Sequence, residues 1–229
     1  MIKHSPKLTP NEFVFGCVYY VLQLLIIPSI LVVINMLLGN PYSEAVINFG
    51  YFAINFIVVT LIFHKFLLGN LRFFLEHPWY HLRWAGTGLL IYFAGNLVIS
   101  MVILLIDPEF ANLNDLTIME MVQENFTLMT IGTVLLVPIV EEVFYRGMIF
   151  RMLFDKHPFA AYGLSMVIFS CIHVAGYIGT TDWFTLVLSF FQYLPAGFAL
   201  AWSYQRSGSI FASVLIHMSV NQIGLLVMR

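Results

Sequence analysis

The sequence contains few charged residues. Only 10% of its 229 residues are Asp, Glu, Lys or Arg, and 60% are hydrophobic, against roughly 25% and 45–50% in soluble domains. One soluble core cannot bury that much apolar surface, so the composition excludes an ordinary soluble domain. No basic patch indicates a nucleic-acid partner. The composition favours a chain surrounded by a lipid bilayer.

Cysteine is also scarce. The two cysteines, Cys17 and Cys171, both fall inside apolar runs. In such a setting cysteine behaves as a small hydrophobic residue. We therefore expect two buried free thiols and no disulfide, which leaves the redox compartment of the protein undetermined.

Long apolar runs make up most of the chain, and a membrane-spanning helix needs about 20 such residues. The fourth run carries Pro138, which predicts a kink or a division into two shorter helices. Residues Thr9-Pro10-Asn11-Glu12 have the pattern of a capping box at the start of the first helix. We predict a single all-α domain over 1–229, a polytopic membrane bundle of seven or eight transmembrane helices. The predicted spans are 13–38, 47–68, 84–106, 128–154, 159–177, 183–205 and 209–228.

The distribution of Lys and Arg predicts the orientation, because these residues favour the cytoplasmic side of a membrane. A cytoplasmic N-terminus leaves only Arg229 outside and Arg146 within the bilayer. The sequence therefore predicts a multi-pass protein of the cell membrane with its N-terminus in the cytoplasm. The cytoplasmic basic residues would be Lys3, Lys7, Lys65, Arg72, Arg83, Arg151, Lys156 and Arg206.

One long polar segment, 107–125, holds five acidic residues and no Lys or Arg. Within it, Leu116, Met119 and Val122 recur at helical spacing, which predicts a short interfacial helix. We expect a solvated exterior segment, with gating of access or binding of cationic peptides as alternatives.

Ionisable and amide side chains inside spanning helices are costly, so they are usually paired and functional. In this chain they gather in the C-terminal 100 residues or so, and the first three spans contain hardly any. Three lie on the fourth span, one on the fifth and two on the seventh. They are Glu141, Glu142, Arg146, His173, His217 and Asn221.

Helical spacing predicts which face of the fourth span each of its three polar residues occupies. Glu142 and Arg146 are four apart and can form a charge pair on one face. Glu141 points about 100° away from Glu142. A carboxylate without such a partner suits a general base.

The remaining polar residues complete a hydrolytic set. His217 and Asn221 share a face and can both donate to a developing oxyanion, and His173 can orient a water against Glu141. Ser170, Cys171 and Ser219 are poor nucleophiles, because none of them has an evident base. The sequence therefore predicts water as the nucleophile.

Three motifs support a family resemblance. Residues 141–146 read EExxxR, 169–173 read FxxxH, and 217–221 read HxxxN. In this order, on three apolar helices, they resemble the CAAX protease and bacteriocin-processing (CPBP) family of intramembrane proteases, also called Abi. The match covers about 126–228, and the compact chain is similar to bacterial members.

The resemblance implies a glutamate-dependent endopeptidase. It assigns water activation to Glu141 and His173 and the oxyanion site to His217 and Asn221. Glu142 and Arg146 would support the site, and Phe169 would pack within it. Residues 126–229 would form the catalytic core and 1–125 a set of variable N-terminal helices.

No metal or other cofactor is expected. A set of one Glu and two His can in principle hold zinc. However, no HExxH motif is present, and Asn221 suits an oxyanion better than a metal.

The expected substrate is a peptide or protein within or at the membrane. By analogy it is a leader peptide, a pheromone or a bacteriocin precursor, ahead of a prenylated CAAX protein. The same polar residues admit a non-proteolytic regulator or self-immunity protein that binds a membrane-protein partner. They also admit a small proton-coupled transporter, although no internal repeat supports it.

Overall fold

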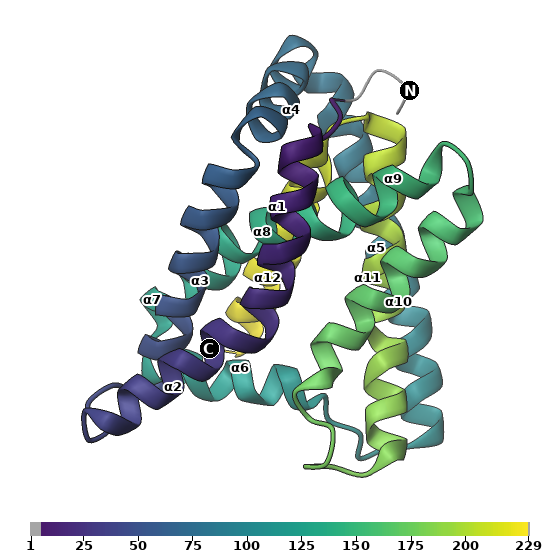
Figure 1. Ribbon diagram of the computed structural model, residues 1–229. Helices are drawn as coiled ribbons and strands as arrows, with labels where there is room; N and C mark the ends of the chain where they lie inside the picture. Colours follow the sequence, from purple (N-terminus) through teal and green to yellow (C-terminus); the bar gives the residue numbers. More distant parts are fainter. Residues whose placement is uncertain (1–5, 229) are drawn as a thin grey trace.

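The computed structural model describes residues 6–228, whose regular secondary structure is helical apart from one isolated bridge between Ile178 and Thr181. Seven helical segments in this range are long and apolar enough to cross a membrane. The predicted all-α membrane bundle is therefore confirmed, with seven spans (Figure 1). The spans are Pro10–Leu37, Glu44–Ile62, Pro78–Ile106, Phe126–Phe154, Pro158–Ala175, Trp183–Ser207 and Ile210–Met228.

Five of the spans are single helices, and two contain π-helical turns. The single helices are α3 (Glu44–Ile62), α5 (Pro78–Ile106), α10 (Pro158–Ala175), α11 (Trp183–Ser207) and α12 (Ile210–Met228). The first span comprises α1 (Pro10–Val21), the π-helical segment η2 (Leu22–Ile26) and α2 (Ile27–Leu37). The fourth comprises α7 (Phe126–Met129), η3 (Thr130–Leu136), α8 (Val137–Glu142), η4 (Val143–Phe150) and α9 (Arg151–Phe154).

The fourth span is one continuous rod rather than two helices. Pro138 lies at the start of α8, directly after η3. Proline has no N–H to donate to the preceding turn, and the wider π-helical turn accommodates the interrupted hydrogen bonding without a break. Such π-helical segments occur often at functional sites, and here they flank the two glutamates.

The second span is shorter than predicted. Helix α3 ends at Ile62, and Phe63 leaves helical geometry before the separate helix α4 (His64–Glu76) begins. Asn70 of α4 is buried, and its side-chain oxygen accepts a hydrogen bond of 3.0 Å from the backbone N–H of Ile210. Helix α4 is thereby docked on the start of α12, at the end of the bundle near the N-terminus (Figure 1).

The predicted capping box at Thr9 is present and also joins two helices. The Glu12 carboxylate accepts hydrogen bonds of 2.8 Å from the backbone N–H of Thr9 and from its hydroxyl. Its other oxygen accepts from the backbone N–H of Phe66, also at 2.8 Å. Glu12 therefore satisfies backbone donors at the starts of both α1 and α4, which explains why this carboxylate is buried.

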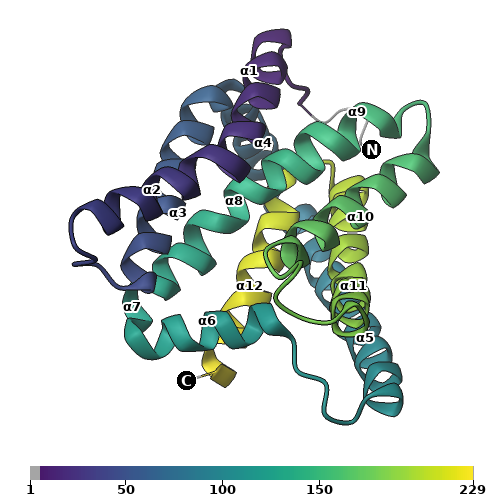
Figure 2. The same cartoon turned by 60° about the horizontal axis from the view of Figure 1, so that its bottom comes forward.

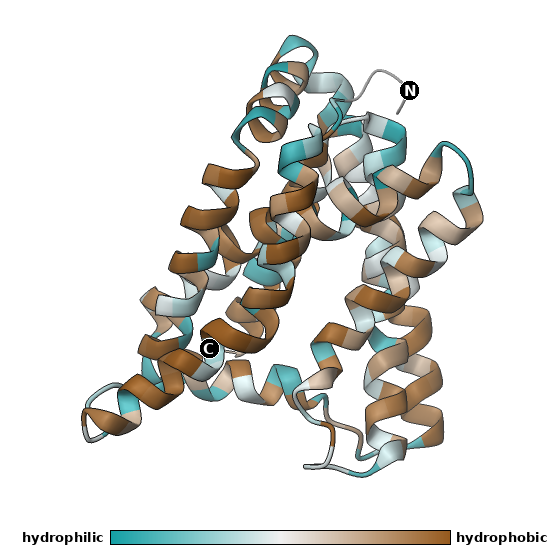
Figure 3. Cartoon of the chain, in the orientation of Figure 1, coloured by the Kyte–Doolittle hydropathy of each residue, from teal (hydrophilic) through white to brown (hydrophobic). Residues whose placement is uncertain are grey.

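The two ends of the bundle differ in charge. The Lys and Arg residues from Lys7 to Arg206 lie in segments at the end that holds α4, α9 and the N-terminus, except for Arg146 (Figures 1 and 3). Helix α6 (Leu113–Glu124), from the acidic segment, lies across the opposite end (Figure 2). Lys3 and Arg229 lie outside the described residues.

The predicted short helix therefore exists as α6, but its apolar stripe was only partly correct. Val122 is buried together with Met121, whereas Leu116 is exposed. The buried face packs beneath the bundle against residues such as Ala45 and Leu225.

The outer surface of the bundle is rich in apolar side chains, as a bilayer requires (Figure 3). Cys17 and Cys171 are free, as predicted, but both are exposed on this surface rather than buried. An apolar run cannot distinguish the lipid-facing side of a helix from its protein-facing side, because both are apolar.

We expect the Glu12→Ala substitution to lower the thermal stability of the detergent-solubilised protein. It removes the acceptor of three hydrogen bonds, and each buried donor left unsatisfied costs about 1–3 kcal/mol. The matched control is Glu76→Ala, at an exposed position at the end of α4. Equal unfolding temperatures for the two variants would contradict this role of Glu12.

Candidate active site

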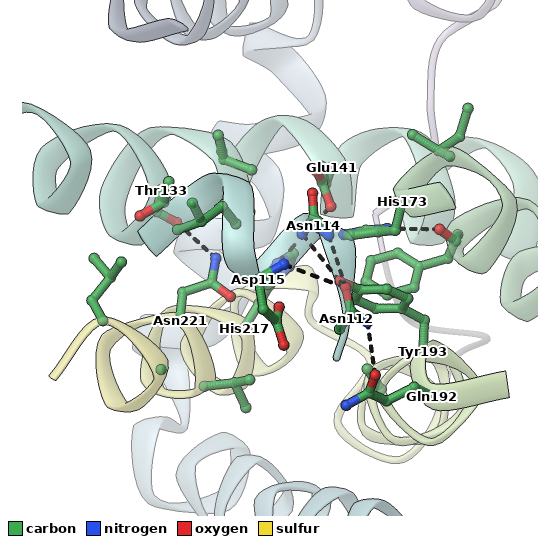
Figure 4. Close-up of a pocket in the computed structure, with 18 of the residues that line it drawn as sticks. Asn112, Asn114, Asp115, Thr133, Glu141, His173, Gln192, Tyr193, His217 and Asn221 are labelled. Atoms are coloured by element: carbon green, nitrogen blue, oxygen red, sulfur yellow. Dashed lines mark hydrogen bonds and ion pairs between the residues drawn. The ribbon is translucent and has the colours of Figure 1, made fainter. Parts of the chain in front are cut away.

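A cavity of about 470 Å³ extends from the middle of the bundle toward α6. Side chains from α3, α5, α6, α8, α10, α11 and α12 line it. The four residues predicted to be catalytic all line this cavity, and Phe169 lines it as well (Figure 4). They are Glu141, His173, His217 and Asn221.

A buried ion pair lies next to the residues that line the cavity but is not part of the lining. The guanidinium Nη1 of Arg146 lies 3.0 Å from Glu142 Oε1, and both side chains are fully buried. The pair predicted from the four-residue spacing is therefore present. Arg146 Nη2 also donates to the backbone carbonyl of Gly197 at 3.2 Å, which connects η4 to α11.

Gly197 permits this connection by its lack of a side chain. A Cβ atom at this position would lie 3.0 Å from Met166 Cα, a backbone atom of α10. A larger residue would therefore push α10 and α11 apart at the point where Arg146 is anchored.

His217 lies between the two glutamates. Its Nδ1 is 3.0 Å from Glu142 Oε1, and its Nε2 is 3.9 Å from Glu141 Oε2. The contact with Glu142 fixes a proton on Nδ1 and turns the Nε2 edge toward Glu141. Nε2 can therefore donate to an oxyanion only when the ring carries a second proton, a condition that spacing alone did not reveal.

Asn221 is fixed by one hydrogen bond. Its amide nitrogen donates to the backbone carbonyl of Thr133 in η3 at 2.7 Å. This bond sets the orientation of the carboxamide, because the reversed amide would place two acceptors together. The second amide N–H and the side-chain oxygen remain for the cavity.

His173 is held by its own helix and by aromatic rings. Its Nδ1 lies 2.7 Å from the backbone carbonyl of Phe169, so Nδ1 carries the donor hydrogen. The ring lies 4.4 Å, centroid to centroid, from both Phe169 and Tyr193. The opposite ring edge, which carries the free Nε2, faces toward Glu141 (Figure 4).

Phe169 explains why the FxxxH motif begins with an aromatic residue. The Arg146 guanidinium carbon lies 4.7 Å from its ring centroid, within the range of a cation–π contact. The ring therefore separates the buried ion pair from His173 and contacts both.

Unlike Glu142, Glu141 has no Lys or Arg partner among the described residues, and its one ion-pair contact is with the His217 ring. Its Oε2 is buried without a hydrogen-bond donor, and 20% of the side chain is exposed. It lines the large cavity and also a smaller one of about 80 Å³. Polar side chains of Gln23, Tyr51 and Asn55 line the smaller cavity.

Serine and cysteine are absent from the described lining of the large cavity. Ser219 donates its hydroxyl to the backbone carbonyl of Leu215 at 2.8 Å, and Ser170 is buried away from the lining. Within residues 6–228, no group of three or more His, Cys, Asp and Glu side chains is arranged to hold a metal ion.

Sequence reasoning missed a polar network where α6 meets the cavity. Asn112 donates to Gln192 at 2.7 Å, and Asn114 donates to the Tyr193 hydroxyl at 3.0 Å. Asn112 also caps α6 by accepting from the N–H groups of Asn114 and Asp115. The run of polar residues at 112–115 signals a helix start, but it does not indicate that this helix folds back onto the catalytic helices.

Residues 123–223 match the family model described as type II CAAX prenyl endopeptidase Rce1-like. This segment contains all three motifs and most of the helices that line the large cavity. No curated protein and no solved structure matches the chain. The segment 123–223 is therefore similar to the Rce1-like CAAX prenyl endopeptidases, in agreement with the resemblance that the three motifs indicated.

Proposed function

We propose that this protein is an intramembrane endopeptidase in which Glu141 and His173 activate a water molecule. The observation that carries the proposal is the Glu141 carboxylate. It lacks a cationic partner other than the His217 ring, and it lines a cavity shared with two histidines and no serine or cysteine.

The proposed reaction begins with water between Glu141 and His173. As the water oxygen bonds to the peptide carbonyl carbon, Glu141 takes the proton and the carbonyl oxygen becomes an oxyanion. The second N–H of Asn221 and a protonated Nε2 of His217 would donate to this oxygen. Transfer of the proton from Glu141 to the departing amine then breaks the C–N bond.

Glu142 and Arg146 are positioning residues in this mechanism, because neither lines the large cavity. Glu142 orients His217 through Nδ1, and Arg146 holds Glu142 and contacts Phe169. The buried ion pair thereby orients His217 in the proposed oxyanion site. It also contacts Phe169, whose ring packs against His173.

The substrate we propose is a membrane-associated peptide or protein. A leader peptide, a pheromone or a bacteriocin precursor ranks ahead of a prenylated CAAX protein. We also propose that the protein resides in the cell membrane with a cytoplasmic N-terminus, as the concentration of Lys and Arg at one end of the bundle supports. The large cavity would then face the exterior half of the bilayer.

We expect Glu141→Gln to reduce cleavage of membrane-anchored peptides at least a hundredfold, as loss of a general base typically does. The measurement compares purified wild-type protein and variant in detergent. The control is Glu109→Gln, at an exposed position before α6. A Glu141→Gln variant that cleaves at the wild-type rate would refute the role of Glu141. A cellular phenotype that survives this substitution would favour the non-proteolytic regulator.

Cleavage should persist when the protein is treated with a strong metal chelator. The nucleophile in the proposed mechanism is water activated by side chains alone, so no metal is required. Activity lost to the chelator and restored by added Zn²⁺ would overturn this mechanism while leaving the peptidase assignment intact.

We expect Arg146→Met to destabilise the protein by about 3–5 kcal/mol, because it leaves Glu142 buried without its cation. The double variant Glu142→Leu/Arg146→Met should recover much of that stability, as both charges are removed. Its kcat should nevertheless stay low with little change in KM, because His217 has lost the acceptor at Nδ1. Wild-type kcat in the double variant would contradict a positioning role.

A further inference from the structure

Apart from the two histidines of the proposed mechanism, the ionisable side chains that line the large cavity are acids and tyrosines. Its lining includes two carboxylates, Glu141 and Asp115, and no Lys or Arg. Glu141 is accounted for by the proposed chemistry, but Asp115 is not. Two like charges facing one cavity favour a cationic guest and repel an anionic one.

Asp115 reaches the cavity because α6 is fixed across it. Asn112 and Asn114, in the same turn of α6, are hydrogen-bonded to Gln192 and Tyr193 of α11. Asp115 lines the same cavity as His217 and Asn221 (Figure 4). Helix α6 thus presents this carboxylate to whatever occupies the site.

Asp115 has no cationic counterpart in the described part of the chain. No ion pair involves it among the described residues. Burial raises the pKa of the Asp115 carboxyl because its charged form lacks such a counterpart, and a cationic group bound beside it would lower that pKa again. The other acidic residues of α6 differ, since Glu120 and Glu124 are exposed.

We infer that Asp115 forms a subsite for a cationic group of the cleaved peptide, either a Lys or Arg side chain or a free N-terminal ammonium. The inference rests on the proposed endopeptidase function and specifies its substrate class. Apolar cavity residues such as Ile118, Met121 and Leu225 would contact the neighbouring apolar side chains of the peptide. A free C-terminal carboxylate would be repelled from this part of the cavity.

A structural role for Asp115 is distinguishable from this one. An acidic residue in the first turn of a helix stabilises the helix dipole, and Asp115 occupies that turn. That role predicts a loss of thermal stability in Asp115→Asn but no dependence of binding on the charge of the peptide.

The first experiment measures binding of fluorescent membrane-anchored peptides to the Glu141→Gln protein in detergent, where cleavage is blocked. The peptides are identical apart from Lys, Gln or Glu at one position, each with a free or an acetylated N-terminus. We expect the Lys peptide to bind at least about tenfold more tightly than the Glu peptide. If the N-terminal ammonium is the ligand, each peptide with a free N-terminus should instead bind more tightly than its acetylated form, whichever residue stands at the varied position.

The same panel is then measured with Asp115→Asn and Asp115→Lys on the Glu141→Gln background. We expect the first substitution to abolish the charge preference and the second to reverse it. The matched control is Glu120→Gln, at an exposed position on the same helix, which should retain the preference. Equal binding of all peptides, no binding of any peptide, or a preference that persists in Asp115→Asn would overturn the inference.

Cleavage of the same peptides by the protein with Glu141 intact separates the two proposals. Charge-selective binding without cleavage would refute the endopeptidase and leave the cationic subsite. Cleavage that depends on Glu141 but ignores peptide charge would refute the subsite and leave the endopeptidase.

Discussion

The buried ion pair between Glu142 and Arg146 is the interaction on which the site depends. In a low-dielectric interior, two charges are stable together only when their remaining hydrogen-bonding positions are occupied with good geometry. Part of this requirement is met from other helices, by His217 of α12, the Gly197 carbonyl of α11 and the Phe169 ring of α10, whereas Glu142 Oε2 and Arg146 Nε are buried without a hydrogen-bond partner. Satisfying one charge pair therefore brings four helices into register and sets the orientation of His217.

Positions along each helix were predictable from sequence, whereas contacts between helices were not. The four-residue spacing predicted the Glu142–Arg146 pair, and apolar length predicted seven or eight spans, of which seven are present in the described residues. Helical periodicity gives the face on which a residue lies, but it does not identify the helix opposite that face. The contact between His217 and Glu142 joins residues 75 positions apart, and it makes the oxyanion role of His217 depend on a second proton.

The errors have a common physical origin. In lipid, the outside of a bundle is as apolar as its interior, so hydropathy loses its power to assign a side to a residue. The exposed cysteines and the misplaced apolar stripe of α6 both follow from this loss. Polar residues kept their predictive value because each one in a spanning helix needs a partner or a cavity. Even so, the polar turn at the start of α6 revealed only a helix cap, since its partners on α11 lie 80 or so residues away.

The position of Glu141 between two cavities has a consequence for solvent supply. A peptide that fills the larger cavity displaces solvent from one side of the carboxylate. The smaller cavity, lined by Gln23, Tyr51 and Asn55, also adjoins this carboxylate. A polar space of this kind can hold water while its neighbour is occupied. In the proposed mechanism, peptide and water can therefore reach the same carboxylate from different cavities, so a tightly bound peptide need not exclude the water.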